Sequence, residues 1–432
     1  MSELKTPSRR QILKTGSTLG AAALAGFPHI ANAQAGNNET IKIGIVGCGG
    51  RGTGALTQAL SADENTKLWA IGDAFDSQVQ NALKNTTKFG ERSKVPAERQ
   101  FTGLEAFQQV IDSGVDLVIL TAPPAFRPQH LRAAVEAGKH TFCEKPMAVD
   151  MAGIHSVLES AKIAKQKNLA IQHGFCWRAH PETRELYKKI HDGELGRVIS
   201  INGNYLASPV KPLPVGTKKP EGMGDVEFQI RWWFNFEWLS AGPLVEQCIH
   251  TVDKVAWAMG DIAPIAAYAN GGKIGQDHPG NIYDHYNVTY EYPGGVFAHV
   301  NQRHFVKSYT NVSDAIQCEG GTGIAPGRCA IKDKDGKITW RSKPIEGENN
   351  MYQVEHNELF AGLRAGKIIN AGEYMANSTA LGLLGREAAH TGQRITWEQL
   401  FKSQEDKAPD DLKMEDDFPI APVPRPGTYQ LG

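Results

Sequence analysis

The chain has 432 residues, of which 41% are hydrophobic and 22% charged, and its formal net charge is -1. At about 150 residues per domain this length predicts two or three domains, and the composition is that of an ordinary globular protein. Because there is no surplus of Lys and Arg, nucleic acids and anionic membrane surfaces are excluded as main partners. Small molecules or other proteins are therefore the expected partners.

The first 33 residues contain the three parts of an export signal in order. Arg9 and Arg10 precede a weakly apolar run from Gly16 to Phe27, and Ala31 to Ala33 form a small-x-small cleavage site. This order predicts a twin-arginine signal peptide over residues 1–33, with export to the periplasm or beyond it; a flexible basic N-terminus is the alternative. The twin-arginine translocase moves folded proteins, so a cofactor acquired before export would have to stay tightly bound.

The remaining sequence shows no sign of a membrane span, a metal site or a redox motif. No apolar run approaches the roughly 18 residues that a membrane helix needs, and the spacing of His, Cys and carboxylates matches no metal site. The six cysteines form no Cys-x-x-Cys pair and are predicted to be buried. Cys318 and Cys329 flank a Gly-rich turn, and a disulfide between them after export is left open.

A glycine-rich turn lies between a predicted strand and a predicted helix. Residues 41–46 are apolar and β-branched, as in a buried parallel strand, and residues 53–61 have the pattern of a helix. The spacing between them is G-x-G-x-x-G, which allows a tight turn, close approach of a pyrophosphate and close packing of helix on strand. It predicts a dinucleotide site formed by Gly47, Gly49, Gly50, Arg51 and Gly52. Whether Arg51 contacts a phosphate or faces solvent is left open.

Asp73 follows the next predicted strand, residues 67–72, and stands 21 residues after Gly52. An acid at this place accepts both ribose hydroxyls, and its charge repels a 2′-phosphate, which favours NAD over NADP. A helix cap or a turn acid is the alternative for Asp73.

Two further predicted strands, residues 115–120 and 140–143, continue a repeated β-α pattern. After a Gly-rich turn this pattern predicts a Rossmann domain, in which ligands bind at the carboxyl ends of the strands. Lys145 follows the second strand, which Pro146 ends, and we expect it where a nicotinamide would sit; a surface turn is the alternative. The other candidate cofactor contacts at these strand ends are Thr121, Pro123, His130 and Glu144.

The predicted fold is α/β, with a NAD-binding Rossmann domain over residues 40–175, an α+β domain over 176–400 and a Pro-rich tail over 401–432. Alternating runs in the second domain predict a large, mostly antiparallel open sheet, whose clearest element is a hairpin of residues 283–292 and 296–305. Residues 208–224 predict a long loop that acts as a lid or contact arm, and the tail is expected to lie extended. Further predicted elements are helices 152–166, 183–191, 353–365 and 375–391 and strands 170–175, 197–205, 311–319, 328–333 and 337–340.

Three motifs in combination resemble the Gfo/Idh/MocA family of glucose-fructose oxidoreductases and inositol dehydrogenases. They are Gly47 to Gly52, the run Ala137 to Pro146, and Glu246-Gln-Cys-Ile-His250-Thr-Val-Asp253. The resemblance runs from about residue 41 to about residue 400. An Arg-Trp segment ahead of Glu-Gln-x-x-His and a Pro-rich tail are similar to the exported branch of the family. The resemblance implies a NAD(P)-dependent oxidoreductase acting on CH-OH groups, assembled as a homodimer or homotetramer through an exposed sheet face.

Oxidation of a secondary alcohol needs a base for the hydroxyl proton and a cation beside the developing alkoxide. His250 is the predicted base, and Lys145, from the other domain, is the predicted cation, which would also lower the imidazole pKa. Glu246 precedes His250 by four residues and Asp253 follows it by three, so on one helix either can fix the imidazole tautomer. A helix surface carrying charged pairs is the alternative, and members of the family usually have Asp at the position of Glu246.

The segment from Gln229 to Trp238 contains five aromatic residues and one Arg. Aromatic faces stack on the C-H faces of sugars and Arg donates to hydroxyls, so the segment suits a carbohydrate; packing in the core is the alternative. In the family an Arg near cofactor and substrate often stands where this chain has Arg178. The predicted substrate contacts are Arg178, Arg231, Trp232, Trp233, Trp238 and Asp253.

These features predict an exported oxidoreductase that transfers hydride between a secondary hydroxyl of a sugar, polyol or glycoside and a tightly bound nicotinamide. Because a cell envelope holds no NAD pool, a second sugar or the product itself would reoxidise the cofactor. Two alternatives stay open: a NAD-dependent glycoside hydrolase that works through transient oxidation and elimination, and a non-catalytic sugar-binding protein. Exported hydrolases of the family differ at the Lys position, so the Glu-Lys-Pro of this chain favours simple dehydrogenation.

Overall fold

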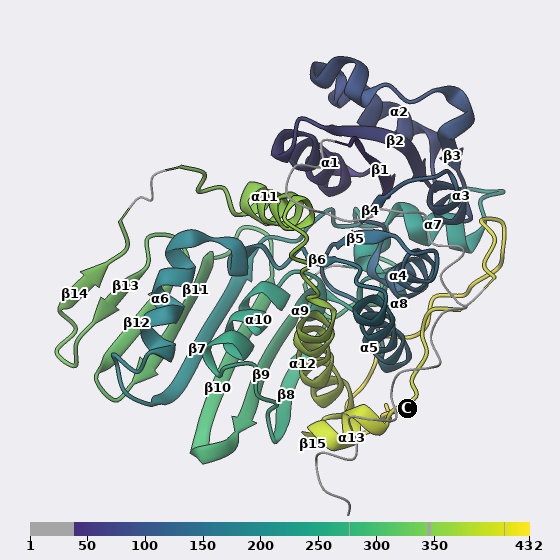
Figure 1. Cartoon of the computed structure of the whole chain (residues 1–432). Coiled ribbons are helices and arrows are strands. Elements are labelled where there is room, and N and C mark those ends of the chain that lie inside the picture. Colours follow the sequence, from purple (N-terminus) through teal and green to yellow (C-terminus); the bar gives the residue numbers. More distant parts are fainter. Residues whose placement is uncertain (1–38, 276, 344–346, 410) are drawn as a thin grey trace, which may run out of the picture.

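The computed structural model describes residues 39–275, 277–343, 347–409 and 411–432, so the predicted signal peptide lies outside the described residues. Two sheets organise the chain (Figure 1). The first has six strands with helices on both faces, and the second has nine strands and forms the other half of the molecule. The predicted α/β fold, a Rossmann domain followed by an α+β domain with a large sheet, is confirmed.

The six strands of the first sheet are all parallel and have the order β3-β2-β1-β4-β5-β6. In this doubly wound order the switch point, where ligands bind, lies between β1 and β4. The central strands are mostly apolar because helices cover both faces of the sheet. The bounds are β1 (Ile41–Val46), α1 (Gly50–Ala62), β2 (Thr66–Asp73), α2 (Asp76–Asn85), η2 (Thr87–Ser93), η3 (Ala97–Arg99), β3 (Gln100–Thr102), α3 (Ala106–Asp112), β4 (Leu117–Leu120), η4 (Pro124–Phe126), α4 (Arg127–Glu136), β5 (His140–Cys143), α5 (Met151–Gln166) and β6 (Ile171–His173).

The second sheet is mixed, with the order β14-β13-β12-β11-β7-β10-β9-β8-β15. Its pairs are antiparallel except β7 with β10, which are parallel over residues 200–207 and 297–304. The predicted hairpin is confirmed as β9 and β10. The bounds are η5 (Cys176–Ala179), α6 (Pro181–His191), β7 (Val198–Ala207), α7 (Asp225–Arg231), η6 (Trp233–Asn235), α8 (Glu237–Ser240), α9 (Pro243–Glu246), α10 (Ile249–Ala258), β8 (Ala266–Gly272), β9 (His285–Tyr292), η7 (Pro293–Gly295), β10 (Val296–His304), β11 (Asn311–Cys318), β12 (Gly321–Ala325), β13 (Ala330–Lys332), β14 (Ile338–Arg341), α11 (Met351–Arg364), α12 (Gly372–Thr391), β15 (Ile395–Thr396) and α13 (Trp397–Lys402).

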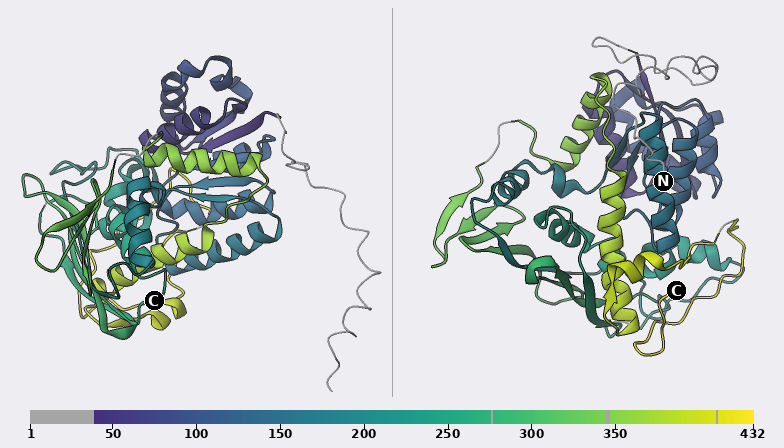
Figure 2. Two further views of the ribbon diagram at one scale, coloured as in Figure 1. Left: turned by 60° about the vertical axis from the view of Figure 1, so that its left-hand side comes forward. Right: turned by 60° about the horizontal axis from the view of Figure 1, so that its bottom comes forward.

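Two helices from the segment assigned to the second domain pack against the first. Leu359, Phe360 and Leu363 of α11 share an apolar core with Ile43 of β1, and α11 lies on α1. The long helix α12 contacts α5 of the first domain and β8 of the second (Figure 2). The two domains are therefore joined by continuous packing, which fixes the residues at their junction relative to one another.

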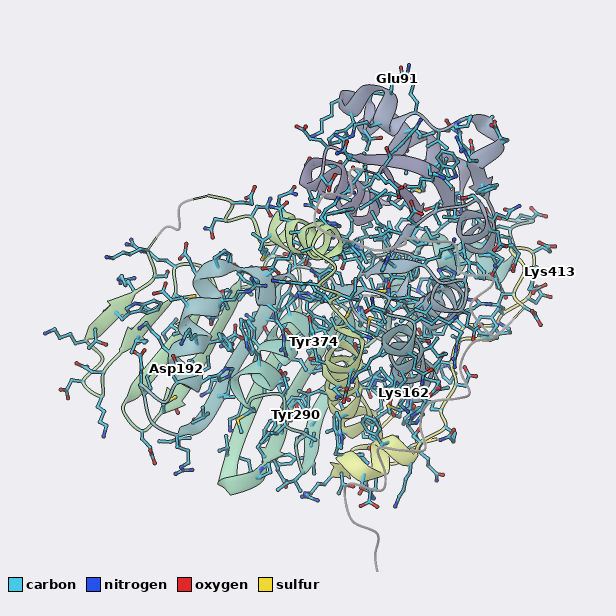
Figure 3. The ribbon with its side chains drawn as sticks, viewed as in Figure 1. Glu91, Lys162, Asp192, Tyr290, Tyr374 and Lys413 are labelled. Atoms are coloured by element: carbon cyan, nitrogen blue, oxygen red, sulfur yellow. The ribbon has the colours of Figure 1, made fainter. Side chains whose placement is uncertain are left out.

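The surface and the interior carry different kinds of side chain. Charged side chains such as Glu91, Lys162, Asp192 and Lys413, labelled in Figure 3, are exposed. Tyr290 is fully buried, and its hydroxyl donates to the carbonyl of Leu381 at 3.0 Å. None of the helices in the described residues has the length and apolar character needed to span a bilayer.

The Pro-rich tail is extended, as predicted, and lies against the body of the protein. The side-chain amide of Gln229 donates to the carbonyl of Phe418 at 2.6 Å, and the hydroxyl of Tyr283 donates to that of Pro424 at 2.8 Å. All six cysteines are free and buried, so the disulfide that the sequence left open does not form in this structure.

Candidate active site

The glycine-rich turn forms the first wall of the candidate site. Gly47 has a φ of +93°, and a Cβ there would come within 2.4 Å of the backbone of Ala122. A Cβ at Gly52 would lie 1.9 Å from the carbonyl oxygen of Gly47, so only glycine lets α1 pack this closely on the turn. A Cβ at Gly49 would meet no described atom within 4 Å, which leaves that stretch of backbone open to a ligand. The turn therefore fits a pyrophosphate at the N-terminus of the 13-residue helix α1.

Asp73 ends β2 beside this turn and braces it. Its Oδ2 accepts a hydrogen bond from the backbone N–H of Cys48 at 2.6 Å, and its Oδ1 accepts one from that of Phe75 at 2.9 Å. Burial raises the pKa of the carboxyl, and the backbone N–H groups oppose that rise. Because each carboxylate oxygen accepts more than one hydrogen bond, Asp73 can brace the turn and still accept ribose hydroxyls.

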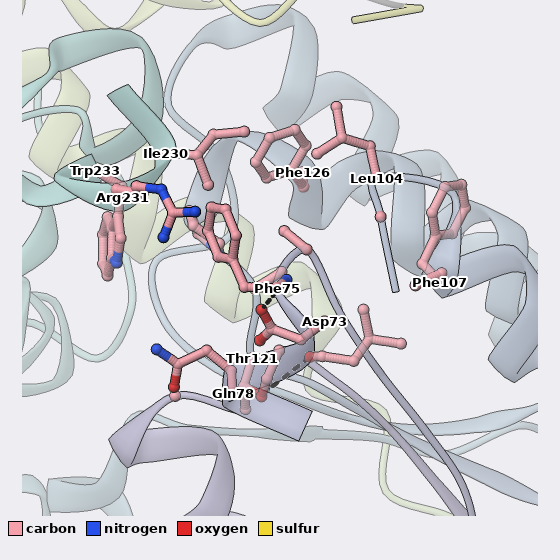
Figure 4. Close-up of a pocket in the computed structure, with 18 of the residues that line it drawn as sticks. Asp73, Phe75, Gln78, Leu104, Phe107, Thr121, Phe126, Ile230, Arg231 and Trp233 are labelled. Atoms are coloured by element: carbon pink, nitrogen blue, oxygen red, sulfur yellow. Dashed lines mark hydrogen bonds between the residues drawn. The ribbon is translucent and has the colours of Figure 1, made fainter. Parts of the chain in front are cut away.

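A pocket of about 340 Å³, within the usual range for small-molecule sites, opens in front of the turn (Figure 4). Thr121 closes its floor by donating from Oγ1 to the carbonyl of Gly47 at 2.5 Å. His130 stacks on Phe107 at 4.3 Å, and burial lowers its pKa to about 3, so its ring is neutral at pH 7. The predicted cofactor contacts that line the pocket are Gly47, Gly49, Asp73, Thr121, Pro123 and His130.

The opposite wall of this pocket comes from the second domain. Arg231, Trp232 and Trp233, which the sequence analysis assigned to a carbohydrate, line it together with the glycine-rich turn. The guanidinium of Arg231 lies 4.2 Å from the centroid of the Phe75 ring. The structure therefore places these three residues at the nucleotide pocket, a location that the aromatic pattern alone did not indicate.

Trp238 packs in the core and does not line the pocket in front of the glycine-rich turn. Its ring is buried, and Nε1 donates to the side-chain oxygen of Gln229 at 2.7 Å. The ring also makes an edge contact with Phe418 of the tail at 5.0 Å. The alternative of packing in the core, which the sequence left open, applies to this tryptophan.

Lys145 and Glu246 meet where the two domains join. Lys145 follows β5 of the first domain, and Glu246 is the last residue of α9, a short helix that begins at Pro243. The ammonium of Lys145 donates to the backbone carbonyl of Glu246 at 2.6 Å and to its Oε1 at 2.9 Å. Both side chains are nearly buried, at 11% and 7% exposure, so the pair is held in a largely water-free setting. The structure thus brings together two of the three predicted catalytic residues.

His250, the third, is the second residue of α10 and is partly exposed. Its Nδ1 is buried and has no hydrogen-bond partner among the described residues. The pKa of the imidazole is well below its ordinary value, first because of burial and then because of the cations Lys145, Lys254 and Arg51. The ring is therefore neutral at pH 7 and able to accept a proton.

The predicted carboxylate partner of His250 is not found. Glu246 ends α9 and His250 is the second residue of α10, so the expected single helix is broken between them. Asp253 is turned to other groups: Nε of Arg178 donates to its Oδ1 at 3.0 Å, and the hydroxyl of Ser378 donates to the same oxygen at 2.7 Å. Among the described residues neither carboxylate is hydrogen-bonded to the imidazole. Asp253 therefore does not fix the imidazole tautomer in this structure, as the sequence had predicted it could.

Arg178 is likewise engaged within the protein. Besides Asp253, its guanidinium donates to Asp261 at 2.9 Å, and it lies 4.5 Å from the centroid of the Tyr374 ring. With these contacts Arg178 positions Asp253 and α10 instead of offering a free guanidinium to a substrate.

Arg51 joins the glycine-rich turn to the end of β5. Its Nε pairs with Glu144 at 2.5 Å and its Nη2 with Glu355 of α11 at 3.2 Å. The carboxylate of Glu144 also accepts the backbone N–H of Lys145 at 3.1 Å. Arg51 therefore connects the glycine-rich turn with the segment of Lys145. The sequence offered two roles for Arg51, a phosphate contact or a solvent-facing side chain, and neither describes this arrangement.

The sequence did not assign the following residues near Glu246 to the site, and it interpreted His304 as a core or surface histidine. Gln247 donates to Oε2 of Glu246 at 2.5 Å and accepts from the hydroxyl of Tyr205 at 3.1 Å. His304 makes a tilted ring contact with Tyr205 at 6.2 Å, and its Nε2 is buried without a partner among the described residues. Tyr205 and His304 come from β7 and β10, which pair although they are far apart in sequence, so no local signal marks them. Within the described residues no group of three or more His, Cys, Asp or Glu could hold a metal ion.

Residues 41–174 match the family described as "Oxidoreductase family, NAD-binding Rossmann fold" (GFO_IDH_MocA), and residues 183–323 match "GFO/IDH/MocA C-terminal domain". Together the two matches cover more than half of the chain.

Curated relatives include inositol 2-dehydrogenase/D-chiro-inositol 3-dehydrogenase of Lactiplantibacillus plantarum, 26% identical over 221 residues, which are 51% of this chain and 53% of the relative. Inositol 2-dehydrogenase 4 of Saccharopolyspora erythraea is 26% identical over 301 residues, 67% of this chain and 75% of the relative. Most of these matches thus span about half the length of the relative.

Solved structures with the same fold include the aldose-aldose oxidoreductase of Caulobacter crescentus in complex with glycerol, with a TM-score of 0.63 at 18% identity. It is matched over 100% of its chain and 83% of this one. A levoglucosan dehydrogenase in complex with NADH and levoglucosan has a TM-score of 0.64 at 16% identity over 99% of its chain and 83% of this one. At these identities the likeness shows the fold alone.

Proposed function

Since this chain belongs to the Gfo/Idh/MocA oxidoreductase family, we propose that it is a NAD-dependent oxidoreductase acting on a secondary hydroxyl of a sugar, polyol or glycoside. The observation that carries the proposal is the pair of Lys145 and Glu246, which joins the two domains at the carboxyl edge of the Rossmann sheet. His250 lies two residues into the next helix, and its pKa responds to Lys145. Bound NAD would accept the hydride from the carbinol carbon and return it in the reverse direction.

His250 takes the hydroxyl proton. It is neutral at pH 7 because burial and three nearby cations lower its pKa. Its Nδ1 is buried, with no hydrogen-bond partner among the described residues, so we assign the accepting role to Nε2. A neutral base beside a cation is suited to remove a proton whose loss leaves a negative oxygen behind.

Lys145 stabilises that oxygen. Two of the three N–H groups of its ammonium are donated to Glu246, which leaves one for the substrate. The backbone carbonyl and the carboxylate of Glu246 hold the ammonium in place, so the cation is oriented before the substrate binds. In this role Glu246 positions Lys145. Relatives that have the shorter Asp at the position of Glu246 would hold the Lys in a different place.

The setting of the enzyme is also part of the proposal. The paired Arg9 and Arg10, the apolar run and the cleavage site support export by the twin-arginine route. An exported enzyme has no NAD pool, so we expect the cofactor to stay bound and to be reoxidised in place. Assembly as a homodimer or homotetramer is expected by analogy with the family.

The proposal is tested with the mature protein, residues 34–432, by following NADH absorbance while a panel of inositols, aldoses and chromogenic glycosides is added. Reduction by at least one polyol or sugar, lost in His250→Gln with NAD still bound, is the expected result. Release of a chromogenic aglycone without net reduction would instead show the glycoside-cleaving alternative. If NAD binds but neither the wild type nor any variant transfers hydride, the protein is a binding protein and the proposal fails.

A further inference from the structure

The nucleotide pocket has a wall that the Rossmann domain does not supply. After the long loop of residues 208–224, α7 and η6 return the chain to the edge of the first domain, near α3 and β4 (Figure 1). Lys211, Arg231 and Trp233 then line the same pocket as Asp73. The second domain thus reaches the place where the ribose of a dinucleotide would lie.

Arg231 is fixed in a definite position over this pocket. Its Nε and Nη2 donate to Oε1 of Glu227, one helical turn earlier, at 2.8 and 2.6 Å. Its guanidinium lies 4.2 Å from the centroid of the ring of Phe75, whose backbone N–H donates to Asp73 (Figure 4). The guanidinium, the Phe75 ring and the acid therefore form one connected group at the mouth of the pocket.

The chemistry of this wall suits a purine nucleoside. Guanidinium planes and aromatic rings stack on nucleobases, and stacking of this kind is worth roughly 1–3 kcal/mol per base. Trp233 is partly exposed and stacks on Phe234 at 3.7 Å, so one face of an aromatic pair borders the pocket. Lys211 adds a second cation to the lining of the pocket, which complements a diphosphate.

The C-terminal tail braces this wall from outside. The backbone N–H groups of Asp225 and Glu227 donate to the carbonyls of Asp416 and Met414, each at 3.1 Å. In return the N–H of Phe418 donates to the carboxylate of Asp225 at 3.1 Å. Tail and helix therefore form a two-way set of hydrogen bonds, so α7 cannot leave the pocket unless the tail moves with it.

Contact between tail and helix is close enough to require glycine. A Cβ at Gly224, directly before α7, would lie 2.1 Å from the carbonyl oxygen of Met414. The φ of Gly224 is -62°, which any residue adopts, so the fit against the tail and not the backbone conformation demands glycine here.

We propose that Phe75, Arg231 and Trp233 form a clamp on the adenosine half of the bound dinucleotide, and that residues 414–418 of the tail hold this clamp closed. The proposal rests on the proposed function, since it assumes that the dinucleotide binds at the glycine-rich turn. It assigns to the second domain and the tail the retention of cofactor that an exported enzyme needs, independently of the catalytic pair at the domain junction.

Arg231→Ala tests the clamp, with Arg394→Ala as the matched control. Both side chains are about half exposed, at 44% and 47%, and each pairs with one glutamate, at 2.6 and 2.5 Å, but Arg394 pairs with Glu291 in the second sheet. The mature proteins are freed of nucleotide, and calorimetry measures the affinity for ADP-ribose and for NAD. The release rate of bound NADH is followed by its fluorescence.

For Arg231→Ala we expect both affinities to fall by the same factor, roughly five- to thirtyfold, with a matching rise in the release rate. Phe75→Leu, which keeps an apolar side chain but removes the ring, should act in the same direction, and Arg394→Ala should change nothing. Wild-type affinity for ADP-ribose in both Arg231→Ala and Phe75→Leu would overturn the clamp. If the wild type itself binds neither ADP-ribose nor NAD, the proposed function fails instead.

Discussion

Replacing Lys145 with Met removes the proposed alkoxide-binding cation while keeping a side chain of similar length. The structure gives Lys145 one N–H that is not donated to Glu246. Loss of one such preorganised donor lowers kcat by about a hundredfold to a thousandfold, or roughly 3–4 kcal/mol. Lys402→Met is the control, because that Lys is exposed and pairs with Glu398, one turn earlier in α13.

The same variant should shift the pH dependence. The pKa of His250 is lowered first by burial and then by Lys145, Lys254 and Arg51. The base works when neutral, so activity is present above this pKa and is lost as the pH falls through it. Without Lys145 the pKa rises, and the acid limb of the rate profile moves up toward the ordinary histidine value of about 6.5.

The assay is the initial rate of NADH formation across roughly pH 5 to pH 9, the range in which histidine titrates. Equal NAD content in variant and wild type shows that the cofactor site is intact. A rate within a fewfold of wild type, or an acid limb that stays in place or moves to lower pH, would refute the pairing of Lys145 with a His250 base.

Three further predictions concern binding and stability. Gly52→Ala should abolish NAD binding measured by calorimetry, because its Cβ would lie 1.9 Å from a backbone oxygen of the turn; wild-type affinity would contradict the geometry of the turn. Asp253→Asn should lower the free energy of unfolding in urea by about 2–4 kcal/mol, because it weakens a buried ion pair with Arg178, yet leave the acid limb of the rate profile in place; a shifted limb would restore the role of Asp253 beside the imidazole. Gly224→Ala should speed NADH release without changing the pH profile, because its Cβ displaces the tail. An unchanged release rate would show that the tail does not help to retain the cofactor.

The elements that sequence predicted well are those whose local pattern is unambiguous. The strands at residues 41–46 and 140–143 match β1 and β5 at both ends, because each is a short apolar run bounded by residues that end a strand. β12 was missed because two of its five residues are glycine, and β8 because it is rich in Ala and Gly. The parallel pairing of β7 with β10 depends on tertiary packing and leaves no local pattern.

In the candidate site, too, some features could be predicted from local sequence patterns and others depend on tertiary structure. The sequence assigned Lys145 and Glu246 to one site because each lies in a recognisable motif, but it paired Lys145 with His250, and the contact between Lys145 and Glu246 is seen only in the structure. The break between α9 and α10 was not visible, so Glu246 and His250 were expected to share one helix. Asp253 does lie on the same helix as His250, but its carboxylate is bound by Arg178 and Ser378, which are distant in sequence. The sequence did not indicate that Arg231 lines the same pocket as Gly47 and Asp73, because this depends on the path of the chain ahead of α7.

The central claim is that a nicotinamide dinucleotide sits between the glycine-rich turn and Lys145 and stays there. The most direct measurement is to purify the mature protein without added nucleotide, denature it, and identify the released compound by absorbance and mass. Near-stoichiometric NAD or NADH, converted from one form to the other when a substrate sugar is added before denaturation, is the predicted result. A protein that releases no nucleotide and binds added NAD weakly would contradict the claim.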